Sequence, residues 1–276
     1  MRYFLVAYRI LFASFLVIGL LLTSPMVGKA AIRDDTVALY LPLDEGRGTT
    51  VKDYSKSGKT GKFGNSGGKD PIWVDGKFGK ALEFDGKSNF VKIEDTADFS
   101  FQADKGITIC AWVKIMKTAL DAHGQNRQPI VMKGNGTDGW EYALYVYDGF
   151  EAGFSAWNCG GSGVSEPSGN KIPANEWHAV CGSFEPKKGS KAYIDGELAT
   201  EAAANANVPC DGNASVFLAH REDGQFLNAV IDEVRIWPYI VDPKTLKSSM
   251  SAPLGGQAVD GKNHLATTWG TIKELY

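Results

Sequence analysis

The chain has 276 residues, with 29 Lys and Arg against 32 Asp and Glu, which gives a formal net charge of −3 at pH 7. A mildly acidic chain with no basic run is a poor partner for nucleic acid or for an anionic membrane surface. These two classes of function are therefore excluded, whereas enzymes, binding modules and structural proteins all stay open.

The first 30 residues have the pattern of a secretory signal peptide. Arg2 and Arg9 provide positive charge, residues 10–22 form an apolar run, and Gly28-Lys29-Ala30 offers a small-x-small cleavage site. The apolar run is shorter than the roughly 20 residues that a membrane-spanning helix needs. We therefore expect residues 1–30 to be removed, no membrane span to remain, and the mature protein to be secreted, in an extracellular or periplasmic location.

From residue 31 onward, short apolar segments alternate with turn residues. Turn pairs such as Asp85-Gly86, Asp148-Gly149 and Asp195-Gly196 separate several of these segments. The pattern predicts an all-β fold, an antiparallel sandwich of two sheets. The expected strands are 37–43, 81–84, 90–93, 107–115, 142–147, 151–156, 177–184, 191–194, 216–219 and 229–237.

A single helix is predicted near the end of the chain. Asp242 suits its N-cap, Pro243 suits its first turn, and residues 244–249 continue it. We expect one domain over residues 31–250, followed by a peripheral tail over residues 251–276 in which Trp269 is the candidate docking residue.

The four cysteines predict two disulfides, because an even number in an exported chain favours pairing. Three pairings are possible. Cys110 and Cys181 each lie within a predicted strand, whereas Cys159 and Cys210 each lie in a predicted loop, so the pairs 110–181 and 159–210 are favoured. No Cys-x-x-Cys pair indicates a zinc site.

Asp232 is out of place in the last predicted strand. Two-residue alternation puts Asp232 on the same face as Val230 and Val234. Glu233 and Arg235 mark the opposite face as the wetter one, so we expect Asp232 to point toward the core. A carboxylate in that position must be neutralised, paired, hydrogen-bonded or bound to a cation.

Six segments follow one another along the chain: Leu39-Tyr-Leu-Pro-Leu-Asp-Glu-Gly46, Gly79-Lys-Ala-Leu-Glu-Phe-Asp-Gly86, Ile107-Thr-Ile-Cys-Ala-Trp-Val113, Glu176-Trp-His-Ala-Val180, Tyr193-Ile-Asp-Gly196 and Ile231-Asp-Glu-Val-Arg-Ile-Trp237. Together they resemble the laminin G-like jelly-roll domains of the concanavalin A-like lectin/glucanase superfamily, over about residues 36–250. The resemblance implies two curved antiparallel sheets, often a structural calcium, and usually binding rather than catalysis. The four cysteines and Pro238-Tyr239 depart from the family pattern.

Calcium takes about six to eight oxygen ligands, so Asp232 would need partners. The candidates are Asp44 at the end of the first strand, Asp53 shortly after it, and Asp85 in a turn. The first and last strands of an antiparallel jelly roll commonly meet, which would bring Asp44 to Asp232. The alternative explanation is that Asp85 only forms a turn and that Asp44 only caps a loop.

Aromatic residues in loops favour a glycan ligand. Trp140, Trp157, Asn158 and Arg221 lie in or beside predicted loops. Aromatic faces stack on the C–H face of a pyranose ring, and polar side chains read the hydroxyl groups. The alternative is that these loop aromatics are incidental.

The sequence thus predicts a secreted, non-catalytic binding module for a glycan or for an extracellular or cell-surface protein, stabilised by structural calcium. A secreted glycan hydrolase and a purely structural adhesion module are the alternatives. The Glu-x-Asp-x-x-Glu acid pair of retaining glucanases is absent, and Glu94-Asp95 and Glu222-Asp223 are adjacent residues that would point to opposite faces of a strand. No nucleophile elbow or His-Glu-x-x-His motif is present, so no enzyme activity is expected.

Overall fold

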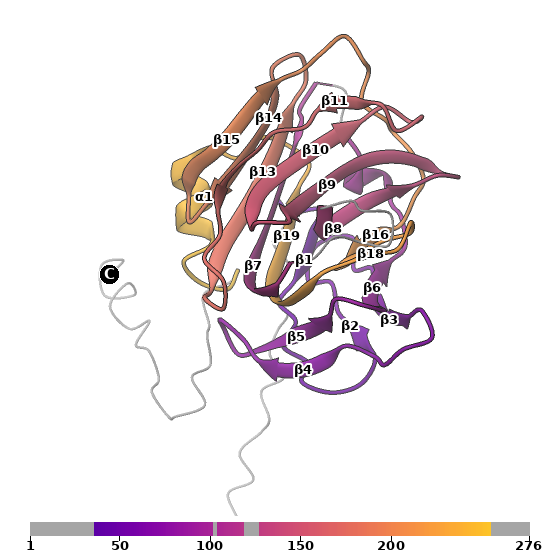
Figure 1. Cartoon of the computed structure of the whole chain (residues 1–276), viewed down its shortest axis with the longest axis vertical. Helices are drawn as coiled ribbons and strands as arrows, with labels where there is room; N and C mark the ends of the chain where they lie inside the picture. Colours follow the sequence, from indigo (N-terminus) through magenta and orange to yellow (C-terminus); the bar gives the residue numbers. More distant parts are fainter. Residues whose placement is uncertain (1–35, 102–103, 119–126, 255–276) are drawn as a thin grey trace, which may run out of the picture. The chain divides into compact units, whose positions relative to one another are not determined.

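The computed structural model describes residues 36–101, 104–118 and 127–254 (Figure 1). The chain divides into two units, residues 1–31 and 32–276, and every described residue belongs to the second. The predicted signal peptide and residues 255–276 of the predicted tail, with Trp269, lie outside the described residues. Within the described ranges, no helix is long and apolar enough to cross a membrane.

The first sheet has eight strands: β1 Leu39–Leu41, β4 Ile72–Asp75, β5 Lys80–Asp85, β7 Ile107–Lys117, β13 His178–Glu185, β14 Gly189–Ile194, β15 Glu197–Ala203 and β19 Asn228–Trp237. Their spatial order is β15-β14-β13-β7-β19-β5-β4, and β1 also pairs with β19. Every neighbouring pair is antiparallel. β1 and β19, the first and last strands of this sheet along the chain, therefore lie side by side.

The second sheet has nine strands: β2 Thr50–Val51, β3 Gly61–Asn65, β6 Asn89–Ile93, β8 Arg127–Asn135, β9 Gly139–Tyr147, β10 Glu151–Trp157, β11 Gly163–Ser165, β12 Ser168–Lys171 and β16 Val216–Leu218. Their order is β11-β10-β9-β8-β16-β6-β3-β2, and β12 also pairs with β10. These pairs are antiparallel too.

Three short elements lie outside the two sheets. They are the 3-10 helix η1 Ala97–Phe99, the hairpin of β17 His220–Arg221 and β18 Gln225–Phe226, and the helix α1 Pro243–Ser249. The Asp242 side chain accepts a hydrogen bond from the Thr245 amide at 3.1 Å, as a capping residue does. The predicted helix is confirmed, and Figure 1 shows it beside β13, β14 and β15.

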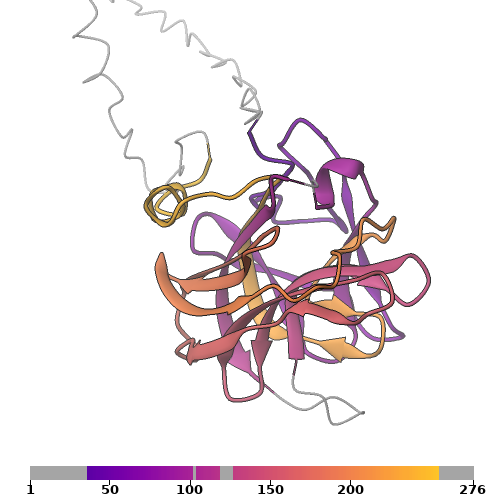
Figure 2. The ribbon, with the colours of Figure 1, turned by 90° about the horizontal axis from the view of Figure 1, so that it is seen from above.

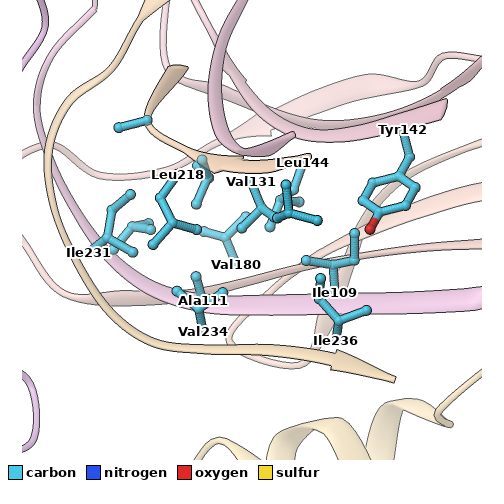
Figure 3. Close-up of a cluster of buried hydrophobic side chains, with 14 of the residues drawn as sticks. Ile109, Ala111, Val131, Tyr142, Leu144, Val180, Leu218, Ile231, Val234 and Ile236 are labelled. Atoms are coloured by element: carbon cyan, nitrogen blue, oxygen red, sulfur yellow. The ribbon is translucent and has the colours of Figure 1, made fainter. Parts of the chain in front are cut away.

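The two sheets pack face to face around an apolar core (Figure 2). Along β9, Tyr142 and Leu144 belong to this core, whereas Ala143 and Tyr145 belong to a separate cluster on the outer face, as two-residue alternation requires. Figure 3 shows core side chains from both sheets, among them Leu144, Val131, Leu218, Val180, Ile231 and Ile236. The predicted all-β, two-sheet sandwich is confirmed.

A bulge in β19 makes one prediction wrong. Between Asp232 and Arg235 the register with β7 shifts, and Glu233 adopts a left-handed backbone with φ +54°. Ile231 and Val234 both lie in the core, so the alternation reverses across the bulge. Asp232 therefore points away from the core side chains of its own strand, although it is fully buried.

The face predicted to be wetter is buried as well. Glu233 and Arg235 are fully buried and form an ion pair. The Tyr40 hydroxyl donates to both carboxylate oxygens of Glu233, at 3.2 and 3.0 Å. The Arg235 guanidinium also donates to the carbonyls of Ser249 and Ala252. The charged pair thus fastens the segment after α1 to the outer face of the first sheet.

Both favoured disulfides are confirmed. Cys110 of β7 and Cys181 of β13 are direct cross-strand partners and are bonded. Cys159, just after β10, is bonded to Cys210, in the segment before β16. All four cysteines are paired.

The reversed alternation of β19 can be tested by stability measurements. Replacing Ile231 by Ala should lower the free energy of unfolding by about 2–5 kcal/mol, because the substitution opens a cavity in the core. Ile72→Ala is the control, since Ile72 is 57% exposed and a surface substitution usually changes stability by less than about 0.5 kcal/mol. Equally small losses in chemical denaturation of the two variants would contradict the position assigned to Ile231.

Candidate functional site

The first candidate site is a corner where the start of the domain meets the bulge of β19. Leu41 of β1 lies opposite Val234 of β19, so the residues that follow β1 approach the bulge. The amides of Phe78 and Lys80, two residues apart in one loop, donate to Asp232 and Asp44 respectively, which places the two carboxylates at the same corner. The structure therefore brings together these two of the four predicted metal ligands.

A glycine-rich loop closes this corner. The Phe78 amide donates to Asp232 Oδ2 at 2.9 Å, and the Lys80 amide donates to Asp44 Oδ1 at 2.8 Å. A side chain at Gly79, where φ is +63°, would overlap the Asp44 carboxylate. Glycine is therefore suited to position 79 for two reasons: it adopts the left-handed backbone without strain, and it has no side chain to clash with the Asp44 carboxylate.

One oxygen of this corner is left without a hydrogen bond. Asp232 Oδ1 is buried and has no hydrogen-bond partner, and burial raises the pKa of this carboxyl to about 8. An unsatisfied carboxylate oxygen beside a second carboxylate is a suitable oxygen-ligand pair for calcium. No group of three or more His, Cys, Asp and Glu occurs with metal-binding geometry in the described ranges, so the remaining ligands would be backbone oxygens and water.

The structure gives the other two predicted ligands different roles. Asp53 Oδ1 accepts hydrogen bonds from the amides of Tyr40 and Ser55 at 3.0 and 2.8 Å. Asp85 Oδ1 accepts from the amides of Lys87 and Ser88 at 2.8 and 2.9 Å, and these bonds help to lower the pKa of Asp85 against the opposing effect of burial. Both side chains organise turns, which is the alternative that the sequence had left open for Asp85.

The second candidate site lies on the outer face of the second sheet and contains three of the four predicted ligand-binding residues. The rings of Trp140 and Trp157 lie 6.2 Å apart, edge to face at 70°. The Arg221 guanidinium carbon lies 4.6 Å from the centroid of the Trp140 ring. Trp140 is partly exposed, whereas Trp157 is only 4% exposed, so the indole of Trp140 forms the surface and that of Trp157 packs beside it.

The fourth predicted residue, Asn158, forms a turn next to these rings. Its Oδ1 accepts a hydrogen bond from the Ser162 amide at 2.8 Å. The adjacent Cys159 carbonyl accepts a bond from the Trp140 amide at 3.4 Å. Asn158 therefore shapes the loop against which Trp140 packs.

This surface also contains polar residues that sequence reasoning missed. Arg221 donates to the Tyr145 hydroxyl at 3.3 Å and pairs with Asp223 at 2.9 Å. The Trp157 indole donates to Glu166 at 2.8 Å. Asp223 and Glu166 come from loops that fold back on the sheet, and no periodic pattern in the sequence marks such positions.

A buried ion pair holds the loop next to the start of β9. Lys133 and Glu141 are both fully buried and in contact, and burial raises the pKa of Glu141 to about 7 although Lys133 opposes this rise. Lys133 donates to the Gly212 carbonyl at 2.9 Å, and the Gly212 amide donates to Glu141 at 3.1 Å. The segment around Cys210 is thereby fixed beside the aromatic surface.

Stacked rings hold the β17–β18 hairpin that carries Arg221. The His220 imidazole lies between the rings of Phe90 and Phe226, with centroids 4.5 Å away on each side. Burial lowers the pKa of His220 to about 4. The folded protein therefore favours the neutral form of the His220 imidazole.

The family is shown by sequence. A laminin G family model described as the concanavalin A-like lectin/glucanases superfamily matches residues 85–247, more than half of the chain. The protein belongs to this superfamily, and the resemblance drawn from the six sequence segments is confirmed. None of the curated proteins matches the sequence.

Three solved structures illustrate the fold. Domain 4 of an extracellular arabinanase from Geobacillus stearothermophilus, in complex with arabinotriose, is 20% identical, with a TM-score of 0.55 and coverage of 77% of this chain and 97% of that one. The binding domain of botulinum neurotoxin DC in complex with rat synaptotagmin II is 12% identical, with a TM-score of 0.59 and coverage of 78% and 51%. The sialidase of Trypanosoma rangeli is 9% identical, with a TM-score of 0.52 and coverage of 77% and 32%.

The chain thus spans about half of the toxin binding domain and a third of the sialidase. At these identities the three structures establish the shared fold, and the functions in their names are those of the other proteins.

The His220 stack should make stability depend on pH. The pKa of His220 in the folded protein is about 4, below the value near 6.5 of an unfolded chain. The unfolded state therefore binds more protons between these two values, and the stabilisation that is present above pH 6.5 falls as the pH falls toward 4, by about 3 kcal/mol. Phe at position 220 would keep a stacked ring but not titrate, so the stability of wild type relative to His220→Phe should drop over this range. Parallel stability curves for the two proteins would contradict the assignment.

Proposed function

We propose that this protein is an exported, non-catalytic module that binds a glycan at the surface formed by Trp140 and Arg221. The observation that carries the proposal is the Arg221 guanidinium held against the partly exposed indole of Trp140. The indole offers a flat apolar face to the C–H groups of a sugar ring, and the guanidinium offers hydrogen-bond donors to its hydroxyl groups. The arabinotriose complex of a domain that this chain covers almost completely supports a glycan ligand.

Export is supported by the two disulfides, because such bonds persist in oxidising compartments outside the cytosol. An extracellular or periplasmic location agrees with this chemistry. The predicted signal peptide over residues 1–30 is part of the same proposal, and N-terminal sequencing of the exported protein would test it.

A protein receptor is the second candidate ligand, favoured by the synaptotagmin complex of the botulinum neurotoxin domain. Binding of a protein with no response to any glycan would favour this candidate. If the protein bound neither a glycan nor another protein, a purely structural adhesion module would be favoured.

Glycan hydrolysis is the alternative activity, and it is considered because a sialidase shares the fold. Two acidic residues of the aromatic surface are engaged with cations: Asp223 pairs with Arg221, and Glu166 pairs with Arg127, each at 2.9 Å. Carboxylates held in this way are less suited to act as a general acid and a nucleophile. Glycan turnover by the purified protein would replace the binding proposal by a hydrolase.

We also propose that a structural calcium ion occupies the corner of Asp232 and Asp44. A cation there would neutralise a buried carboxylate whose Oδ1 has no partner. It would join the end of the first strand to the bulge of the last one, and it would therefore stabilise the sandwich without taking part in ligand recognition.

Substitutions in the proposed glycan surface should weaken binding without unfolding the protein. Trp140→Ala removes the stacking ring and should weaken binding of the best ligand from a glycan array by up to about 10-fold, since a stacked aromatic contact is worth about 0.5–1.5 kcal/mol and about 1.4 kcal/mol corresponds to a factor of ten. Isothermal titration calorimetry measures the change. Arg221→Gln should weaken the same ligand because the hydroxyl donors of the guanidinium are lost.

Trp177→Ala is the matched control for Trp140→Ala. Trp177 is also a partly exposed tryptophan with a cation near its ring, Lys114 at 5.5 Å, but it precedes β13 of the other sheet. If Trp177→Ala and Trp140→Ala had the same effect on glycan affinity, the proposed surface would be wrong.

Calcium should raise the melting temperature. A ligand that binds only the folded state adds about 2.7 kcal/mol of stability at a concentration one hundred times its dissociation constant. Chelation should reverse this gain, Asp232→Asn should abolish the response, and Asp44→Asn should reduce it. Asp75→Asn is the control, because the Asp75 carboxylate is almost fully exposed, close to the same loop. Equal melting curves with calcium and with chelator would show that the corner needs no ion.

A further inference from the structure

A groove of about 520 Å³ lies on the outer face of the first sheet, where β13, β14 and β15 meet the chain segment 240–243. This volume is within the range of about 300–1,000 Å³ that is usual for small-molecule sites. The residues that define it are Ser183, Lys191, Tyr193, Glu201, Val241 and Pro243. The aromatic surface of Trp140 and Arg221 belongs to the other sheet, so the two sites are separate.

The floor of the groove is built in advance of any ligand. Tyr193 is 6% exposed, and its hydroxyl is hydrogen-bonded to the Ser183 side chain. The phenol ring of Tyr193 also packs in the apolar cluster that contains Val241. A rigid floor reduces the conformational entropy that binding would otherwise cost.

The chain segment 240–243 forms one wall of the groove and is held against the sheet by hydrogen bonds. The Thr108 side chain donates to the Tyr239 carbonyl at 2.8 Å and accepts from the Val241 amide at 3.0 Å. Asp242 then caps α1, and Pro243 begins its first turn. Val241 and Pro243 therefore present a preformed apolar wall opposite the polar strands.

The rim carries charges of both signs in matched pairs. Lys191 of β14 lies 3.2 Å from Glu201 of β15, and Lys188 lies 2.7 Å from Glu185. All four side chains are between 38% and 73% exposed, so they face solvent at the edge of the groove. The pairs leave no excess positive charge to attract an anion, and Asp242 adds a further carboxylate to the lining.

We propose that this groove binds a neutral saccharide, as a second site independent of the Trp140 surface. An apolar wall suits the C–H face of a sugar ring, and a rim that mixes ammonium donors with carboxylate acceptors suits its hydroxyl groups. An acidic sugar would meet three carboxylates, those of Glu185, Glu201 and Asp242, and is disfavoured. A peptide is the other occupant that the test must distinguish.

The test is a titration of the isotope-labelled mature protein, followed by NMR, with neutral trisaccharides of glucose, galactose, arabinose and xylose, with trigalacturonate, and with an uncharged tripeptide. At least one neutral sugar should shift the amide signals of Lys191, Tyr193 and Glu201. Ala203→Trp, which adds bulk at an exposed alanine of the groove lining, should weaken these shifts about 10-fold or more. Ala206→Trp, at an exposed alanine outside the groove lining, should leave them unchanged.

Each failure has a distinct signature. No shift of the groove amides by any neutral sugar up to its solubility limit, tighter binding of trigalacturonate or the tripeptide, or indifference to Ala203→Trp would each overturn the groove proposal. Trp140→Ala should leave the groove titration unchanged, so that a failure of the Trp140 surface and a failure of the groove can be told apart.

Discussion

The bulge of β19 is the constraint on which most of this structure depends. One non-glycine residue, Glu233, takes a left-handed backbone, a conformation that costs on the order of 1 kcal/mol. The cost is offset by what the reversed alternation allows. Ile231 and Val234 both lie in the core. Asp232 lies at the corner that also contains Asp44, and Arg235 contacts the segment after α1.

Two buried ion pairs hold chain segments against the outer faces of the two sheets. Arg235 and Glu233 hold the C-terminal segment on the first sheet, and Lys133 with Glu141 holds the loop around Cys210 beside the second. Removing one partner of such a pair leaves an uncompensated charge in the interior, which is strongly unfavourable. The segment after α1 and the segment around Cys210 are therefore held in place by the ion pairs that link them to the sheets.

The two outer faces of the sandwich are covered by different elements, so the two proposed binding sites differ in their surroundings. The first face is covered by α1 and the segments around it, which leaves a groove at one side. The second face carries an aromatic cluster partly covered by the β17–β18 hairpin, with Trp140 at its exposed edge. A corner cation would serve neither face directly, because it joins the first and last strands of the domain.

The fold class, most long strands, the capped helix and the favoured disulfide pairs could be predicted from the sequence, since each depends on local alternation, turn residues or compartment chemistry. It missed β8, whose pattern is interrupted by Pro129 and a register shift. It also placed Asp232 on the wrong face, because a bulge changes the phase of alternation without any required glycine. The approach of Asp44 to the bulge was expected from the pairing of the first and last strands. In contrast, the tertiary structure was needed to show that Asp53 and Asp85 form turns and that Glu166 and Asp223 reach the aromatic surface. Several of these contacts are short in sequence, such as Asp223 with Arg221 and Asp85 with Lys87, but each depends on the path of a loop, which two-residue alternation does not encode.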